Sequence, residues 1–170
     1  MKNLFILITF LTSFIFTSTV IAQKQNFSVK SKRAIQLYKD ADILATYNKD
    51  YARAVFTLRT LIKEKPEFVE AHLLLGDIYG KVKRYTSQKK SYMKVLALVP
   101  SDPRHVTMYY NLGLIYQQEQ NYTEAIKFLQ KIEDFPLASK TITNKAITLK
   151  QVCEAEILKQ EERSLTLAQD

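Results

Sequence analysis

Apolar residues recur three and four positions apart in consecutive segments of the chain, at about 35–47, 51–63, 70–81, 85–98, 107–118 and 123–132. Residues at these spacings share one face of an α-helix, so each segment predicts a helix with one buried side. Short polar stretches such as YNKD at 47–50 and QNY at 120–122 predict turns between them. With 3 glycines and 4 prolines in 170 residues, the composition also favours long helices. The chain is therefore predicted to be all-α.

The helical segments form a repeat. LLGDIYGK at 74–81 is nearly copied by NLGLIYQQ at 111–118, and each places a glycine three residues before a tyrosine. The separation of 37 residues fits a period of 34 plus a three-residue insertion in the loop PSDPRH at 100–105. One period earlier, a third copy has Asp42 in place of the glycine and Ala45 in place of the tyrosine. Positions that align across the later copies include Leu75 with Leu112, Tyr85 with Tyr122, Tyr92 with Leu129 and Val95 with Ile132.

This 34-residue helix–turn–helix period resembles the tetratricopeptide repeat (TPR). The resemblance implies a right-handed α-solenoid of three repeats, at 35–68, 69–102 and 106–139, then a capping helix at 140–164 and a tail at 165–170. A helical glycine costs about 1 kcal/mol relative to alanine. The family's small residue lies where the two helices of a repeat cross, so we expect Gly76 and Gly113 at close helix contacts. Pro66, Pro100 and Pro136 are expected to end the second helices.

The first 22 residues are predicted to be a signal peptide. Lys2 precedes an apolar run from Leu4 to Phe16, and Val20 and Ala22 occupy the −3 and −1 positions of a cleavage site before Gln23. An uncleaved membrane anchor is the alternative interpretation. Residues 23–34 are then a linker, and the protein is expected to be exported and periplasmic or outer-membrane-associated.

A narrower resemblance is to the exported N-terminal TPR modules of Gram-negative envelope proteins that continue into β-propeller and outer-membrane-protein-A-like domains. It is carried by the export signal ending in Ala-Gln, the three repeats and the Cys-Glu-Ala step at 153–155. This sequence ends at Asp170, so peptidoglycan binding is not implied for these residues.

The resemblance also implies a concave groove, lined by the first helix of each repeat, that binds a peptide or helix of a partner protein. The candidate groove residues are Gln36, Lys39, Ile43, Tyr47, Glu70, Leu73, Asp77, Lys81, Thr107, Tyr110, Leu114 and Gln117. The family's best-known groove clamps a C-terminal carboxylate with Lys and Asn, then Asn, then Lys and Arg. The corresponding positions here are Lys39, Ile43, Leu74, Thr107 and Asn111. Only one of them matches, so chaperone-tail binding is not expected.

The net charge of +8 is unevenly distributed. Residues 23–104 carry 17 basic and 8 acidic side chains, whereas 105–170 carry 7 and 9. A basic face is predicted from Lys83, Arg84, Lys89, Lys90 and Lys94, in a stretch without an acidic residue. It is either a solvated helix face or a weak contact for an acidic partner, an anionic membrane surface or a cell-wall polymer. Nucleic acid is not expected, because the chain is predicted to be exported and no recognition module is present.

No catalytic, metal or cofactor site is predicted. Asp40 and Asp42 point to different sides of a helix, and the two histidines and single cysteine have no ligand spacing. Cys153 is expected to be a buried apolar residue, with intermolecular disulfide pairing as the alternative.

The predicted function is that of a non-catalytic exported TPR scaffold or adaptor that binds a peptide or helix of a partner in a cell-envelope assembly. The alternatives are an accessory subunit or regulator of a cell-wall enzyme, or the head module of a longer peptidoglycan-anchored protein.

Overall fold

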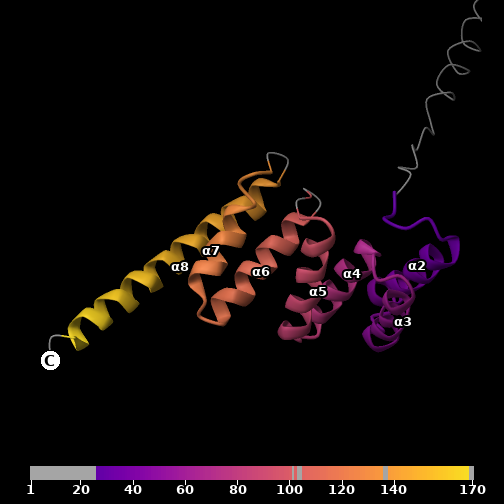
Figure 1. Cartoon of the computed structure of the whole chain (residues 1–170), viewed down its shortest axis with the longest axis horizontal. Helices are drawn as coiled ribbons and strands as arrows, with labels where there is room; N and C mark the ends of the chain where they lie inside the picture. The colour runs from indigo at the N-terminus through magenta and orange to yellow at the C-terminus, as the bar shows by residue number, and fades with distance from the viewer. Residues whose placement is uncertain (1–25, 101, 103–104, 136–137, 169–170) are drawn as a thin grey trace, which may run out of the picture.

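The computed structural model describes residues 26–100, 102, 105–135 and 138–168, and the predicted signal peptide lies outside them. The described residues form helices and no strands (Figure 1). The helices are α2 (Lys32–Thr46), α3 (Tyr51–Glu64), α4 (Val69–Lys81), α5 (Tyr85–Leu98), α6 (Val106–Gln118), α7 (Tyr122–Gln130) and α8 (Lys140–Leu167). Within this part of the chain, no helix is both long enough and apolar enough to cross a membrane.

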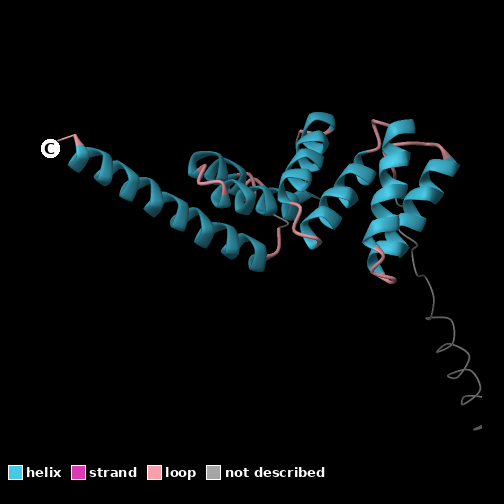
Figure 2. Ribbon diagram, turned by 90° about the horizontal axis from the view of Figure 1, so that it is seen from below, coloured by secondary structure: helices cyan, strands magenta, loops and turns pink. Residues whose placement is uncertain are grey.

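The helices pack in sequential pairs, α2 with α3, α4 with α5 and α6 with α7, and α8 then packs against α7 and α6 (Figure 2). This arrangement confirms the predicted all-α solenoid with a terminal capping helix. Most boundaries agree with the sequence pattern to within a residue or two. The first helix starts earlier than expected, at Lys32, because the Ser31 side chain accepts a hydrogen bond from the Ala34 N–H. The helix expected to reach Ile132 ends at Gln130, and residues 131–134 form turns.

Each turn between the paired helices places one residue at positive φ: Lys49 at 56°, Lys83 at 58° and Gln120 at 59°. The residue after it is the N-cap of the next helix. Asp50 and Asn121 accept hydrogen bonds from the N–H groups of Arg53 and Glu124. At the corresponding position in the second repeat, Arg84 provides no side-chain cap, so α5 lacks a stabilising contact that α3 and α7 have.

The repeated glycines lie at close helix contacts, as the sequence predicts. A Cβ on Gly76 would lie 2.4 Å from Cε1 of Tyr92, and a Cβ on Gly113 would lie 2.7 Å from Cγ of Leu129. Tyr92 and Leu129 belong to the second helix of the same repeat and are buried. Neither helix pair could approach this closely with a larger residue at the glycine.

The segment before α2 was expected to be a linker, but its described part packs on the first two repeats. The Phe27 ring lies edge-on to Tyr38 and Phe68, with centroids 5.5 Å and 6.0 Å away. The Ser28 hydroxyl donates to Oε2 of Glu70 at 2.6 Å and accepts from the Val69 N–H at 3.0 Å. Phe27 is therefore half-buried and packs against the first hydrophobic core.

Helix α8 covers the end of the solenoid only along its first half. Ala146 and Cys153 are buried, whereas every residue from 158 to 168 is exposed. The tail predicted to begin at residue 165 is helical up to Leu167. The second half of α8 projects past α7 (Figure 1).

Candidate peptide-binding groove

A cleft of about 610 Å³ opens between α4 and α6, with the ends of α2 and α5 at its side. The residues that line it are Asp42, Ala45, Thr46, Leu74, Asp77, Ile78, Gly80, Lys81, Tyr85, Gln88, Thr107, Asn111, Leu114, Ile115 and Gln118. The lining residues on α4, and likewise those on α6, recur at steps of three and four residues. They therefore lie along one face of each helix. Leu74, Leu114 and Ile115 give the cleft an apolar surface between polar groups.

A buried hydrogen-bond network fixes the floor of the groove and links three helices. The Tyr92 hydroxyl on α5 donates to Oδ1 of Asp77 on α4 at 2.6 Å. The Tyr92 hydroxyl oxygen in turn accepts hydrogen bonds from Nε2 of Gln88 and from Nδ2 of Asn111 on α6, each at 3.2 Å. The Tyr92 side chain is fully buried, so these bonds replace the water that its hydroxyl has lost. The network holds the second and third repeats in register at the groove.

The groove is acidic on balance. Burial raises the pKa of Asp77 above its usual value, while the Tyr92 hydrogen bond and the nearby Lys81 partly oppose this. Burial also raises the pKa of Tyr38 to about 12, assisted by the negative charges of Asp42, Glu70 and Asp77. Lys81 is the one cation among the lining residues, against Asp42 and Asp77. A ligand group that is positively charged therefore has a favourable place here.

Only some of the predicted groove residues line this cleft, namely Asp77, Lys81, Thr107 and Leu114. Leu73 and Tyr110 pack instead against the second hydrophobic core. Ile43 and Tyr47 are exposed outside the lining, and Gln36 donates a hydrogen bond to Asp40. Glu70 binds Ser28. Lys39 and Gln117 also lie outside the lining.

The candidate groove residues did not include Leu74, Asn111 or Gln118, although Leu74 and Asn111 had been assigned to positions that correspond to the family's carboxylate clamp. Leu74 and Asn111 stand two residues before the aligned glycines, so they occupy one structural position in successive repeats. The prediction chose positions 73 and 110 instead, and one residue on a helix corresponds to a rotation of about 100°. That rotation turns Leu73 and Tyr110 from the groove toward the core.

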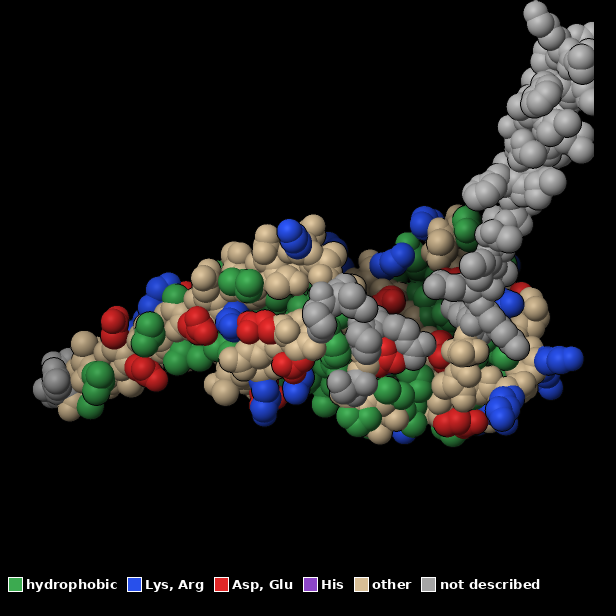
Figure 3. Space-filling model, turned by 90° about the horizontal axis from the view of Figure 1, so that it is seen from above, with side chains coloured by type: hydrophobic (Ala, Val, Ile, Leu, Met, Phe, Trp, Pro, Cys, Tyr) green, Lys and Arg blue, Asp and Glu red, His purple; other side chains and the backbone are tan. Residues whose placement is uncertain are grey.

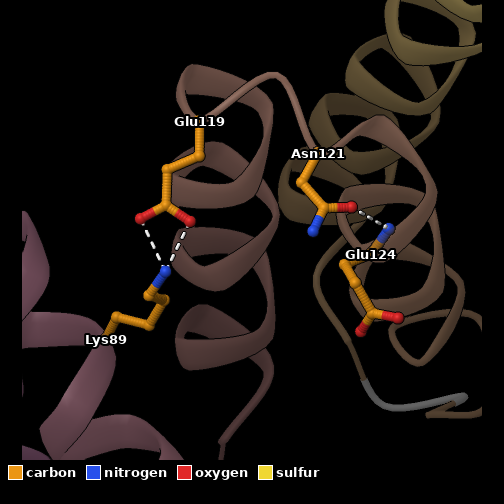
Figure 4. A network of polar contacts seen from close by, with 4 residues as sticks. All are labelled: Lys89, Glu119, Asn121 and Glu124. Atoms are coloured by element: carbon orange, nitrogen blue, oxygen red, sulfur yellow. Dashed lines mark hydrogen bonds and ion pairs between the residues drawn. The ribbon is translucent and has the colours of Figure 1, made fainter.

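The five residues of the predicted basic face lie in different surroundings in the structure. Lys89 forms an ion pair with Glu119 across the α5–α6 contact (Figure 4). The Nζ of Lys89 also lies 4.8 Å from the centroid of the Tyr116 ring. Lys89 therefore contributes to packing between repeats rather than to a free cationic surface. Lys83 lies in the turn before α5. Arg84, Lys90 and Lys94 line a separate cleft on the other side of the second repeat.

Cys153 is buried, as expected. Burial, assisted by Glu154, raises the pKa of its thiol. Among the described residues, no group of three or more His, Cys, Asp or Glu side chains is arranged to hold a metal ion.

Comparison with known proteins identifies the repeats. The family model of the tetratricopeptide repeat matches residues 69–102 and 106–134, which contain the pairs α4–α5 and α6–α7. These two segments match the TPR repeat, whereas α2, α3 and α8 lie outside the match.

Solved structures support the fold over most of the chain. The first TPR domain of Spaghetti (RPAP3), bound to an HSP90 peptide, superposes with a TM-score of 0.62 at 18% identity, covering 74% of this chain and 96% of that one. The Yersinia enterocolitica type III secretion chaperone SycD, in complex with a peptide of the translocator YopD, gives 0.59 at 19% identity, covering 77% and 97%. YrrB, a TPR protein with an unusual peptide-binding site, gives 0.63 at 19% identity, covering 76% and 62%. At these identities the likeness concerns the fold alone.

A curated relative is the human protein O-mannosyl-transferase TMTC3, which is 26% identical over 101 residues. The match covers 58% of this chain but only 11% of the relative. It therefore concerns the repeats and carries no information about the transferase activity.

Proposed function

We propose that this protein is a non-catalytic adaptor that binds a segment of a partner protein in the groove between α4 and α6. The observation that carries the proposal is the groove itself: an apolar lining above a floor fixed by the Asp77–Tyr92–Asn111 network. A preorganised floor lowers the entropy lost on binding, because its side chains are already held in place. The related folds of RPAP3, SycD and YrrB each carry a peptide or a peptide-binding site, which supports the same use here.

The chemistry of the groove favours a particular kind of segment. The HSP90 peptide bound by RPAP3, SRMEEVD, is acidic. This groove contains Asp42 and Asp77, and the positions of the carboxylate clamp hold Leu74, Thr107 and Asn111. An acidic tail would meet repulsion and no clamp. We therefore expect a segment with a lysine or arginine beside apolar residues, so that the cation approaches Asp77 and the apolar groups cover Leu74 and Leu114.

The proposed place of action is the cell envelope. The predicted signal peptide at 1–22 supports export, and a periplasmic or outer-membrane-associated adaptor is the role that fits it. Recovery of protein that begins at Gln23 from the periplasm would agree with this proposal. Intact Met1–Ala22 in the membrane fraction would contradict it.

Selection of random peptides on the immobilised chain from Gln23 tests the binding role directly. The recovered peptides should be enriched in Lys or Arg flanked by apolar residues. Their affinity, measured by fluorescence anisotropy, should fall about tenfold or more in Leu74→Ala and Leu114→Ala, since a buried aliphatic anchor contributes on the order of 2 kcal/mol. Phe56→Ala is the matched control, because Phe56 is an exposed apolar residue on α3 outside the groove. Peptides that bind both groove variants as tightly as the parent would refute the proposal.

A further inference from the structure

A second cleft lies on the opposite side of the second repeat, between α3 and α5. It measures about 840 Å³, larger than the groove. Five cations line it: Arg59, Lys63, Arg84, Lys90 and Lys94. No aspartate or glutamate is among the lining residues, and none of the five cations forms an ion pair with a described residue.

The same cleft has apolar surface between its cations. Ile62, Pro66, Leu75, Met93 and Ala97 contribute to the lining, and the Met93 side chain is exposed. An adjoining hollow shares Arg59 and Lys63 with the cleft and includes Phe56, a phenyl ring that is 74% exposed. Like charges gathered around exposed apolar groups are unfavourable in an isolated molecule. A ligand that is both apolar and acidic would complement the charges and the apolar surface of this cleft.

The projecting half of α8 has this complementary character. Glu154, Leu158, Glu161 and Leu165 follow one another at steps of four, three and four residues, so they share one helix face. All four are exposed, and Glu162 flanks them. The two cations of this segment, Lys159 and Arg163, fall on the other side of the helix. Figure 3 shows hydrophobic and acidic side chains interspersed along the projecting end.

No other described part of the chain covers the projecting segment. Residues 158–168 are all exposed, and an isolated helix of this length is marginally stable in water. The end of α8 lies at one end of the molecule and α3 at the other, so α8 does not reach the cleft of its own chain (Figure 1).

We infer that the basic cleft between α3 and α5 receives the projecting end of α8 from a second copy of this chain. Glu154, Glu161 and Glu162 then face the cluster of lysines and arginines, and Leu158 and Leu165 cover Phe56, Ile62 and Met93. The contact is head-to-tail, so each copy keeps one cleft and one α8 end for further neighbours, and copies assemble into a ring or an open chain. The peptide groove between α4 and α6 remains open in every copy, so an assembly of this kind presents several grooves at once.

Sedimentation velocity of the chain from Gln23 over a range of concentrations tests the inference. The weight-average mass should rise with concentration in about 50 mM salt, and the association constant should fall about tenfold or more in about 500 mM salt, because the contact depends on opposite charges. A chain that stays monomeric at about 0.5 mM in low salt would overturn the inference, given that weak specific contacts are still measurable at this concentration.

Charge reversal identifies the two surfaces. Lys63→Glu/Lys94→Glu lowers the summed charge of the five cleft positions from +5 to +1, and Glu154→Lys/Glu161→Lys changes the summed charge of positions 154, 161 and 162 from −3 to +1. Each double variant should be monomeric alone, whereas an equimolar mixture should associate, because the unaltered α8 end of the first variant meets the unaltered cleft of the second. Lys140→Glu/Lys145→Glu serves as the control and should associate like the parent, since neither residue lies in the cleft or on the α8 face. Circular dichroism should show unchanged helix content in all variants.

The outcomes distinguish the proposed contact from self-association through another surface. Association that persists in both double variants would overturn the inference and indicate pairing through another surface. A mixture that stays monomeric would overturn it as well, because the complementary charges would then be shown not to meet. Since none of the substituted residues lines the peptide groove, peptide binding should be unchanged in every variant, and loss of self-association leaves the proposed function intact.

Discussion

Replacing Gly76 with alanine tests how closely the two helices of the second repeat are packed. The added Cβ would lie 2.4 Å from Cε1 and 2.6 Å from Cδ1 of Tyr92. Carbon atoms pack favourably at about 3.5–4.0 Å, so the ring must move by roughly 1 Å. Tyr92 has no free space for this movement, since it is fully buried and its hydroxyl is bonded to Asp77, Gln88 and Asn111.

The magnitude follows from two opposing effects. Overpacking a well-filled core costs about 1–3 kcal/mol. Alanine recovers about 1 kcal/mol of helix propensity. The expected net result is a loss of about 1–2 kcal/mol for Gly76→Ala. Gly113→Ala should cost less, because the added Cβ meets the branched end of Leu129, which has other rotamers and lies on the short helix α7.

Urea unfolding followed by circular dichroism measures these differences. The second substitution, Tyr92→Leu, removes the ring and gives the second repeat the glycine–leucine pair of the third repeat, Gly113 and Leu129. In a double-mutant cycle, Tyr92→Leu should relieve about 1 kcal/mol of the cost of Gly76→Ala. A Gly76→Ala variant as stable as the parent, or a cycle that is additive, would refute the packing explanation of the repeated glycine.

Three further predictions concern other parts of the fold. Arg84→Asn should add the N-cap that α5 lacks and raise the free energy of unfolding by about 1 kcal/mol in urea titrations, whereas no gain would contradict the comparison with Asp50 and Asn121. The folded-state pKa of Asp77 is raised, so the folded protein binds more protons than the unfolded chain above pH 3.8. The stability of the parent relative to Asp77→Asn should therefore fall as pH rises through this window, and a difference independent of pH would be inconsistent with burial of the carboxyl group. Cys153 is fully buried and its pKa is raised, so it should react with a disulfide reagent only after unfolding; rapid reaction of the native protein would show that α8 detaches from α7.

The sequence predicted the helices and their order because their signals are local. A 3.6-residue period, a polar turn and a repeated glycine are each visible within a few dozen residues. The contact partner of Gly76 could also be anticipated, since the crossing point recurs in each repeat.

The surfaces were harder to predict, because they combine residues from different repeats. Leu74 was considered only as a clamp position, and its neighbour Leu73 was taken as the groove residue. Lys89 was assigned to a free basic face, but Glu119, 30 residues away, pairs with it. The cleft joins Arg59 and Lys63 on α3 to Lys94 on α5, and no pattern within one helix shows that they meet. The docking of Phe27 on Tyr38 and Phe68 likewise depends on tertiary packing.

Amide chemical-shift mapping of the ¹⁵N-labelled chain with a selected peptide tests most directly whether the groove between α4 and α6 binds a peptide. The largest shifts should cluster at Leu74, Asp77, Asn111 and Leu114, and they should disappear in Leu114→Ala. Shifts centred on Arg59, Lys63 and Lys94, with the groove amides unchanged, would contradict peptide binding in the groove.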